Sequence, residues 1–344
     1  MQKILITGFG FMGGIHAQVY GALSDAAVVA VVDDDVNRAK TKMKQIGIDV
    51  PAYSDFNQAV KAHDIDVVDI CVPTSHHARY IKGALEAGKH VFCEKPFAGT
   101  AIEARKLATA ARRAGRKMQI GHCIRFWPEY QALESYKKAK RGGRLLSLSL
   151  FRRSARPNYS VGDWINQEKL SGGSAFDLHI HDTDYVLHLL GRPKAVTSVG
   201  TKDVTGWSHM FTTYHFDNIA VTAEGGWNYP AQWGFQMGFE AVFEHAVLEF
   251  DSRANPTLMI TEKSGKRQPL GFEQPQVGDS KINGGNISSL GGYFNELQYF
   301  IACLQAGRQP TIATPLQAAE SVQTVLAEIK SANLGRTIKL RQKS

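Results

Sequence analysis

The sequence predicts an α/β protein in which a doubly wound parallel sheet is followed by an α+β domain with an open-faced, mostly antiparallel sheet. Three observations indicate this. Short apolar runs alternate with helical stretches over the first third of the chain, which is typical of a parallel sheet covered by helices. Strand-like runs without intervening helices dominate the second half, which favours antiparallel pairing. A chain of 344 residues is long enough for two such domains.

Composition indicates an ordinary folded protein and excludes several functional classes. The chain is 43% apolar and 21% charged, and it has no apolar stretch long enough to cross a bilayer and no secretory signal. We therefore expect a cytoplasmic protein with no membrane partner. The net charge of +8 raises the question of nucleic acid. However, the basic residues form small groups, with no recognition helix or aromatic stacking pattern, so we expect no nucleic-acid partner.

The four cysteines indicate buried free thiols and favour neither a disulfide framework nor a zinc site. Cys71, Cys93, Cys123 and Cys303 lie far apart in apolar surroundings, and none forms a C-x-x-C pair. We therefore expect no metal in this protein.

The first strand-like run, residues 3–7, leads into a glycine-rich turn and a helical stretch, residues 14–23. The turn, Gly8-Phe9-Gly10-Phe11-Met12-Gly13, is a G-x-G-x-x-G sequence. In such a turn the first glycine permits the bend, the second admits a pyrophosphate, and the third lets the helix pack on the strand. The next apolar run, residues 27–32, ends at Asp33, whose carboxylate can accept hydrogen bonds from an adenosine ribose. The sequence therefore predicts a dinucleotide site.

The acidic run Asp33-Asp34-Asp35 bears on the choice of cofactor. Three successive carboxylates would repel a 2'-phosphate, so the sequence favours NAD over NADP. Arg38, about one helical turn later, is the only nearby cation that could weaken this effect. We expect it to be a solvated helix residue.

The alternation of strands and helices continues to residue 122. Strands are expected at residues 67–72, 89–93 and 118–120, and helices at 56–61, 78–87 and 101–115. The strand-like runs are apolar nearly throughout, as in a parallel sheet, and we expect six strands in total. We place the domain boundary here. Residues 1–122 would form the dinucleotide-binding domain, and residues 123–344 the substrate-binding and oligomerisation domain.

Glu94-Lys95-Pro96 directly follows the strand expected at residues 89–93. A side chain in this place emerges at the carboxyl end of the strand, which is the edge where ligands bind in open parallel sheets. The proline keeps Lys95 in an extended or turn conformation at a defined corner. Lys95 is therefore a candidate for a cation beside the cofactor.

The pattern changes after residue 125. Strands are expected at residues 145–153, 195–204, 210–216, 220–227, 234–239, 246–251 and 257–262, and helices at 128–138, 293–305 and 315–333. Such a series favours a largely antiparallel sheet with helices on one face and the other face left for a partner subunit. Residues 265–286 are expected to form a loop. Arg152, Arg153 and Arg156 leave recognition of an acidic substrate open.

A helix expected at residues 175–190 carries Asp177, His179 and His181 near its start. Asp177 and His181 are four residues apart, hence on one face of the helix and close enough to interact. Three interpretations remain open for these side chains. The two histidines could bind a metal, but on a helix they point roughly 200° apart. His181 could instead be a buried structural residue, or a general base that faces a bound nicotinamide.

Four motifs stand in order along the chain: Gly8-x-Gly10-x-x-Gly13, Pro73-x-x-x-His77, Glu94-Lys95-Pro96 and Gly172-Gly173-x-x-x-Asp177-x-x-x-His181. Together they resemble the Gfo/Idh/MocA family of sugar and inositol oxidoreductases, and the likeness runs nearly end to end. The resemblance implies a Rossmann domain joined to an open-faced α/β domain whose exposed sheet makes dimers or tetramers. It also implies that Lys95, Asp177 and His181 form the catalytic set.

The chemistry of alcohol oxidation agrees with this set. The reaction needs a hydride acceptor, a base for the hydroxyl proton and a cation near the developing alkoxide; His181 suits the base and Lys95 the cation. Asp177 can orient the substrate or the imidazole. Cofactor contacts are expected from Gly8, Phe9, Gly10, Phe11, Met12, Gly13, Asp33, Pro73, Thr74, His77, Glu94 and Lys95. Substrate contacts are expected from Arg125, Trp164, His179 and Tyr293.

The sequence thus predicts an NAD-dependent dehydrogenase of a sugar or cyclic polyol, assembled as a homodimer or homotetramer. Two alternatives remain open. The same fold could use tightly held NAD as a recycled redox partner to hydrolyse a glycoside, or it could serve as a non-catalytic, NAD-linked sugar sensor. Accumulation of NADH with free sugars would exclude the hydrolase, and the presence of both Lys95 and His181 counts against a sensor.

Overall fold

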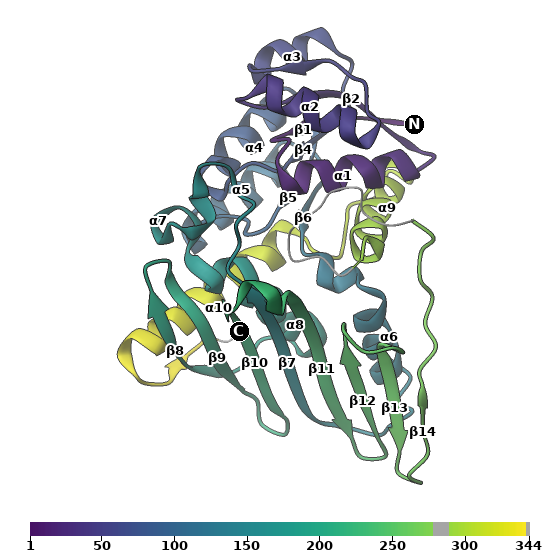
Figure 1. Cartoon of the computed structure of the whole chain (residues 1–344), viewed down its shortest axis with the longest axis vertical. Coiled ribbons are helices and arrows are strands. Elements are labelled where there is room, and N and C mark those ends of the chain that lie inside the picture. The colour runs from purple at the N-terminus through teal and green to yellow at the C-terminus, as the bar shows by residue number, and fades with distance from the viewer. Residues whose placement is uncertain (278–288, 342–344) are drawn as a thin grey trace.

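The computed structural model describes residues 1–277 and 289–341 and contains two sheets (Figure 1). A six-stranded sheet lies at the amino-terminal end of the molecule and a nine-stranded sheet at the other, with helices between them. In the described ranges, no helix combines the length and the apolar character that crossing a membrane requires.

The first sheet is parallel, with the strand order β3-β2-β1-β4-β5-β6. Its strands are β1 (Gln2–Thr7), β2 (Ala26–Val32), β3 (Ala52–Tyr53), β4 (Val67–Ile70), β5 (His90–Glu94) and β6 (Met118–Gly121). The order runs outward from β1 in both directions, so the switch point of the sheet lies at the carboxyl ends of β1 and β4. The predicted six-stranded doubly wound sheet is confirmed.

Helices cover both faces of this sheet, which is why the side chains of β4 and β6 are all buried. The helices are α1 (Phe11–Ala22), α2 (Val36–Ile46), α3 (Phe56–Ala62), α4 (His77–Glu86) and α5 (Ala101–Arg113). Helices α2, α3 and α5 are capped by the residues that precede them. The side chains of Asp35, Asp55 and Thr100 each accept a hydrogen bond from a backbone N–H of the first turn. Helix α1 begins three residues earlier than predicted and includes Gly13 and Gly14.

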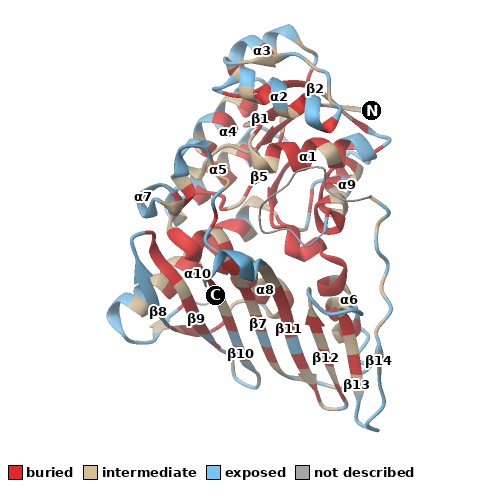
Figure 2. Cartoon of the chain, viewed as in Figure 1, coloured by how far each residue is buried: buried red, intermediate tan, exposed pale blue. Residues whose placement is uncertain are grey.

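The second sheet has the order β14-β13-β12-β11-β7-β10-β9-β8-β15. Its strands are β7 (Leu145–Ala155), β8 (Ala195–Asp203), β9 (Gly206–His215), β10 (Ala220–Tyr229), β11 (Phe235–Phe243), β12 (Ala246–Asp251), β13 (Leu258–Glu262), β14 (Arg267–Pro269) and β15 (Ile338–Lys339). Neighbouring strands are antiparallel except for the central parallel pair β7 and β10. Buried and exposed residues alternate along these strands, as the colours of β9 and β10 show (Figure 2).

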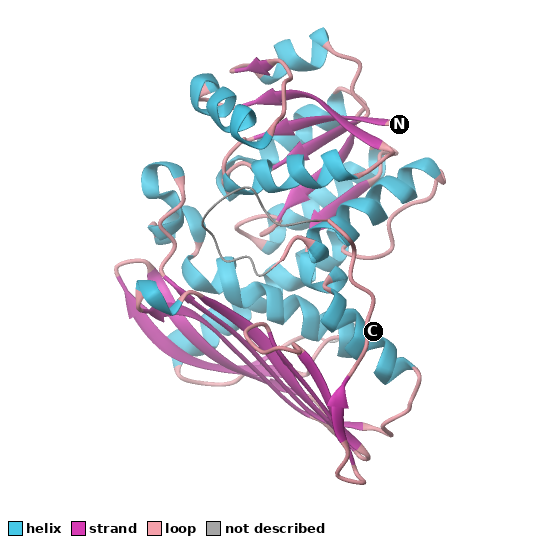
Figure 3. Ribbon diagram, turned by 45° about the vertical axis from the view of Figure 1, so that its right-hand side comes forward, coloured by secondary structure: helices cyan, strands magenta, loops and turns pink. Residues whose placement is uncertain are grey.

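Helices lie on one face of the second sheet and leave the other face bare (Figure 3), as the sequence predicts. The helices of this part are α6 (Pro128–Lys138), α7 (Glu168–Ser171), α8 (Ile180–Leu190), α9 (Gly291–Gln305) and α10 (Pro315–Leu334), with a π-helical turn η4 (Ala175–His179) before α8. Helices α9 and α10 also pack against α1 and α5 of the first part. The division between residues 122 and 123 therefore stays a prediction.

No range was predicted for β3 of the first sheet, and two strands of the second sheet were not predicted, both of which lie at its edges. β14 falls inside the loop expected at residues 265–286, and β15 follows the last predicted helix. Each has only two or three residues, too few for a hydrophobic pattern to be recognised. The part of that loop from residue 278 onward lies outside the described residues.

Candidate active site

A cavity of about 540 Å³ opens where the carboxyl edge of the first sheet meets the start of helix α8. Its size is that of a ligand site. The predicted residues that line it are Gly8, Gly10, Phe11, Met12, Asp33, Pro73, Thr74, Glu94, Lys95, Trp164, Asp177, His181 and Tyr293. The predicted residues outside its lining are Phe9, Gly13, His77, Arg125 and His179.

The glycine turn has the geometry of a phosphate cradle. Gly8 has a φ of 82°, and a Cβ atom at Gly13 would lie 2.1 Å from the Gly8 carbonyl oxygen, so neither position tolerates a side chain. A Cβ atom at Gly10 would meet no atom within 4 Å and would project into open space. Helix α1 begins here without a side-chain cap or an acidic residue in its first turn. Its amino-terminal N–H groups and dipole therefore fit the pyrophosphate of NAD.

Asp33 lies at the end of β2 and is held by three hydrogen bonds. Its Oδ2 accepts from the Phe9 backbone N–H at 2.7 Å, and its Oδ1 accepts from the Asp35 N–H at 2.9 Å. Oδ1 also accepts from the Arg38 guanidinium at 2.5 Å. Arg38 is therefore a partner of Asp33 that lines the cavity, and not the solvated residue the sequence suggested. Phe9 contributes its backbone to the site while its side chain is buried.

The loop after β4 places Pro73 and Thr74 on the cavity but turns His77 away from it. A short 3₁₀ turn, η1 (Thr74–His76), precedes α4, so His77 is already helical and 1% exposed. Its Nε2 donates to the Val72 carbonyl at 2.9 Å. Burial lowers the pKa of His77, so the ring is neutral and stabilises the loop, while His76 takes the place on the cavity.

Lys95 and Asp177 form an ion pair across the cavity, between β5 and η4. The Lys95 Nζ donates to Asp177 Oδ1 at 3.0 Å and to the Asp177 carbonyl oxygen at 2.6 Å. The two side chains are 13% and 17% exposed, so both reach the cavity. The structure thus brings together two residues that are 82 positions apart in the chain.

His181 lies on the same cavity at the start of α8. Burial lowers its pKa well below the ordinary value, and the positive charges of Lys95 and Arg152 lower it further. The imidazole is therefore neutral at pH 7 and can accept a proton. Its Nδ1 is buried and has no hydrogen-bond partner among the described residues.

Asp177 does not hold His181, although the two are four residues apart. The backbone N–H of Ile180 donates to the Ala175 carbonyl, five residues earlier, so the helix is wider at this turn. A π-helical turn changes the direction of the side chains before it relative to those after it. The Asp177 carboxylate therefore meets Lys95, and within the described ranges no hydrogen bond joins it to His181.

Arg125 is buried beside α8 and is not free to contact a substrate. Its guanidinium donates to both oxygens of Asp184, each at 2.7 Å, and to the Gln317 side chain at 2.8 Å. Arg125 lies on η2 (Cys123–Phe126), whose turn directs it toward α8 and α10. Arg125 was expected to contact the substrate because no sequence pattern links it to Asp184, its partner in the structure.

His179 is likewise enclosed within the protein. It is 0% exposed, and its Nε2 lies 3.0 Å from the Thr212 hydroxyl and 3.4 Å from a carboxylate oxygen of Glu328. Burial, then the neighbouring positive charges, lower its pKa to about 3, so the ring is neutral. These contacts give His179 a structural role in the packing of η4 on β9.

Trp164 and Tyr293 line the cavity as predicted. Arg152, which was considered from the sequence as a contact for an acidic substrate, also lines it, and the structure adds Tyr159. The Tyr159 ring lies 4.9 Å from the ring of Phe11 in the glycine turn. The Arg152 guanidinium donates to both oxygens of Asp182, at 2.9 and 3.1 Å. Tyr159 lies in an irregular segment without periodicity, so no sequence pattern distinguished it from its neighbours.

Comparison with known proteins identifies the family of this chain. Residues 2–122 match the family described as the oxidoreductase family with an NAD-binding Rossmann fold, and residues 130–249 match the GFO/IDH/MocA C-terminal domain. The chain is 33% identical to inositol 2-dehydrogenase of Rhizobium meliloti over 314 residues, which cover 88% of this chain and 89% of that protein. It is 31% identical to the oxidoreductase YrbE of Bacillus subtilis over 59% of this chain and 58% of that protein.

Solved structures show the same fold. A levoglucosan dehydrogenase in complex with NADH and levoglucosan superposes with a TM-score of 0.84 at 21% identity, covering 99% of this chain and all of that one. Both halves of the chain and their order along the sequence are therefore those of one family. The protein belongs to the GFO/IDH/MocA family of NAD-binding oxidoreductases.

Proposed function

We propose that the protein transfers a hydride between NAD and a secondary hydroxyl of a sugar or cyclic polyol. The observation that carries this proposal is the Lys95–Asp177 ion pair, which shares one cavity with a neutral His181 and with the glycine turn. Bound NAD would supply the hydride acceptor. The glycine turn and Asp33 would hold its phosphates and adenosine ribose, and Pro73, Thr74 and Glu94 its nicotinamide half.

Each catalytic residue has a distinct task in the proposed reaction. His181 takes the proton of the substrate hydroxyl during oxidation, because its lowered pKa keeps the ring neutral. Lys95 donates a hydrogen bond to the oxygen as negative charge develops on it. Asp177 orients the Lys95 ammonium and accepts a hydrogen bond from a neighbouring substrate hydroxyl. In the reverse direction His181 returns the proton.

The charges of the cavity favour an uncharged substrate. Arg152 is bound to Asp182, and Lys95 to Asp177, so neither cation of the substrate half is left to pair with a carboxylate or phosphate. Arg153 and Arg156 are paired as well, with Glu224 and Asp203. The aromatic rings of Tyr159, Trp164 and Tyr293 line the cavity and suit the apolar face of a sugar or inositol ring. The similarity to inositol 2-dehydrogenase supports this choice.

We further propose that copies of the chain associate through the bare face of the second sheet. This face exposes large apolar side chains, among them Val199 and Phe211, which are 62% and 50% exposed. A homodimer or homotetramer would bury them, and light scattering after gel filtration tests this. We place the protein in the cytoplasm, which agrees with four unpaired cysteines.

A substrate screen tests the proposed reaction. Inositols, aldoses, anhydrosugars and uronic acids are incubated with NAD or NADP, and NADH or NADPH absorbance is followed. We expect turnover with an uncharged ring and NAD. Hydrolysis of glycosides without accumulation of NADH would instead support a hydrolase, and no turnover at all would support a sensor. The variant His181→Ala is expected to lose turnover and to retain NAD binding; loss of NAD binding would contradict the role given to His181.

A further inference from the structure

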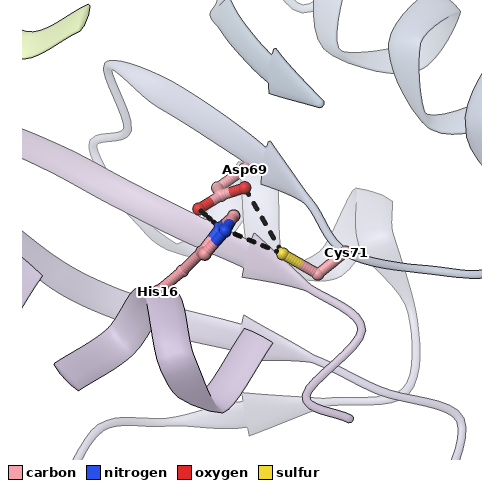
Figure 4. A group of neighbouring side chains, drawn as sticks. All are labelled: His16, Asp69 and Cys71. Atoms are coloured by element: carbon pink, nitrogen blue, oxygen red, sulfur yellow. Dashed lines mark hydrogen bonds and ion pairs between the residues drawn. The ribbon is translucent and has the colours of Figure 1, made fainter. Parts of the chain in front are cut away.

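His16 of helix α1 connects the glycine turn to the catalytic edge of the first sheet, although it lies outside the cavity lining. The side chain is 0% exposed. Its Nδ1 lies 2.8 Å from Asp69 Oδ2 and 3.3 Å from Cys71 Sγ, both at the end of β4 (Figure 4). Its Nε2 lies 3.1 Å from Oε1 of Glu94, at the end of β5. One imidazole therefore joins three elements beneath the site.

The spacing of His16, Asp69 and Cys71 indicates a hydrogen-bonded group and not a metal centre. Their candidate ligand atoms lie within 4.8 Å of one another. Two ligands on one tetrahedral zinc ion, each about 2.0 to 2.1 Å from it, would stand about 3.3 Å apart. The 2.8 Å between His16 and Asp69 is too short for that and is the length of a charge-assisted hydrogen bond. A proton therefore lies between these two atoms.

The surroundings of His16 favour a charged ring. Burial alone would lower its pKa, but the Asp69 carboxylate and Cys71 raise it well above the ordinary value. Burial would in turn raise the pKa of Glu94, but His16 and then Lys95 lower it. The groups that act on this part of the site are Asp69 and Cys71 of the β4 end, Glu94 of β5, Tyr20 of α1 and Glu296 of α9. An imidazolium therefore lies between two carboxylates.

The Glu94 carboxylate occupies a space that the neighbouring backbone leaves open. A Cβ atom at residue 121 would lie 2.7 Å from Glu94 Oε1, so Gly121 leaves the room that this carboxylate occupies. Its Oε2 accepts from the Lys95 backbone N–H at 3.1 Å. Glu94 thus holds the backbone of the residue whose ammonium meets Asp177. Among the described residues, Oε1 has no hydrogen-bond partner, and the His16 ring is the cation beside it.

We propose that His16 is a positioning residue that fixes the Glu94 carboxylate and, through it, directs Lys95 toward the reacting oxygen. This inference rests on the proposed function, because it assigns Lys95 a place beside that oxygen. His16 acts at a distance from substrate and touches no reacting atom. Its contribution therefore falls mainly on the catalytic step.

Two isosteric variants test this. The amide nitrogen of glutamine takes the place of Nε2, so His16→Gln keeps a donor toward Glu94. The amide of asparagine takes the place of Nδ1, so His16→Asn keeps a donor toward Asp69 and leaves Glu94 without one. Both variants remove the charge and the ring. They therefore differ chiefly in the contact that the proposal requires.

We expect kcat to fall about threefold in His16→Gln and about 30-fold or more in His16→Asn, the latter being the cost of leaving a buried carboxylate oxygen without a polar group beside it. KM for the polyol and the Kd of NAD should stay within about threefold in both, because the glycine turn and Asp33, which would hold the phosphates and adenosine of NAD, are unchanged. Equal losses of kcat in the two variants, or a loss confined to NAD affinity, would overturn the proposal.

A second measurement does not depend on turnover. The rate at which Lys95 is acylated, followed by mass spectrometry in the NAD complex, reports how firmly its ammonium is held by Asp177. We expect faster acylation in His16→Asn than in His16→Gln and the wild type. If the wild type oxidised no polyol but this order held, the proposed function would fail while the positioning role stood. Identical rates in all three proteins would overturn the positioning role.

Discussion

Two ion pairs on the same helical segment differ in nearly every property that separates function from structure. Lys95 and Asp177 meet at the cavity, where both side chains are partly exposed and the lysine is a single point charge. Arg125 and Asp184 meet in the interior, 2% and 1% exposed, through two parallel hydrogen bonds. In this second pair, the two parallel hydrogen bonds join the guanidinium to both carboxylate oxygens. The first keeps capacity for another partner, and a substrate hydroxyl would provide it.

The two histidines of this segment repeat the contrast. Both have a lowered pKa and are neutral, so protonation state alone does not distinguish them. The Nε2 of His179 forms a hydrogen bond with the Thr212 hydroxyl, whereas His181 lines the cavity. A shifted pKa is therefore evidence of burial. It is evidence of function only when the group also lines a ligand site.

Breaking the interior pair should have the largest effect on stability. Arg125→Met leaves the Asp184 carboxylate buried without its guanidinium, which costs about 3–5 kcal/mol in the free energy of unfolding. Urea denaturation followed by circular dichroism measures this. A loss below about 1 kcal/mol, the value of an exposed pair, would show that the two pairs do not differ as described.

Breaking the cavity pair should affect catalysis and spare stability. Lys95→Met removes the cation beside the developing alkoxide and should lower kcat/KM by about 10²–10³-fold. The free energy of unfolding should change by less than about 1 kcal/mol, because Asp177 remains hydrated at the cavity. Steady-state kinetics and urea denaturation on the same preparation separate the two quantities. Destabilisation comparable to that of Arg125→Met would place Lys95 among the structural residues.

The stability of the protein at acid pH should also depend on the Arg125–Asp184 pair. Burial would raise the pKa of Asp184, but Arg125 and then His122 lower it to about 2. The pKa of Asp184 is lower in the folded state than in the unfolded chain, where it is near 4. The ionised carboxylate therefore contributes fully to the free energy of unfolding above about pH 4, and this contribution is lost as the pH falls toward 2. We expect a loss of about 2–3 kcal/mol over that range. Asp184→Asn should flatten this part of the curve; an unchanged slope would contradict the assignment.

The smallest effect concerns the pH dependence of His181. Its neutral form is the base, and its pKa is lowered, so the base stays competent as the pH falls below 6.5. We expect kcat/KM for oxidation to fall by less than about 20% between pH 8 and 6.5, whereas an ordinary histidine would lose about half its activity there. An activity decrease centred at pH 6.5 would show that burial and the charges of Lys95 and Arg152 do not lower the pKa of this ring.

The sequence predicted the first sheet well because its signals are local. Gly8, Gly10 and Asp33 each determine a turn or a strand end within a few residues, and Asp55 and Thr100 mark helix starts in the same way. The grouping of Lys95 with Asp177 and His181 came from the order of motifs and from the family resemblance. Their positions on one cavity agree with that prediction, while their catalytic roles stay a proposal.

The remaining features depend on contacts that no local pattern encodes. The partners Arg125 and Asp184 are 59 positions apart, and His16 and Asp69 are 53 apart. The π-helical turn that separates Asp177 from His181 has no residue signature of its own, so an ordinary helix was the natural expectation. Residue type alone therefore placed His179 and Arg125 at the substrate. In the structure both side chains form hydrogen bonds with buried partners, Thr212 and Asp184 respectively.

The two edges of the nine-stranded sheet determine how this protein behaves when it is concentrated. An open sheet edge is a template on which further strands, and eventually fibrils, can grow. Here both edges end in very short strands, β14 and β15, and β14 carries the charge of Arg267 and ends at Pro269, which has no N–H to donate. Growth by strand addition is blocked at these strands. The association that we propose uses the bare face instead, away from these edges.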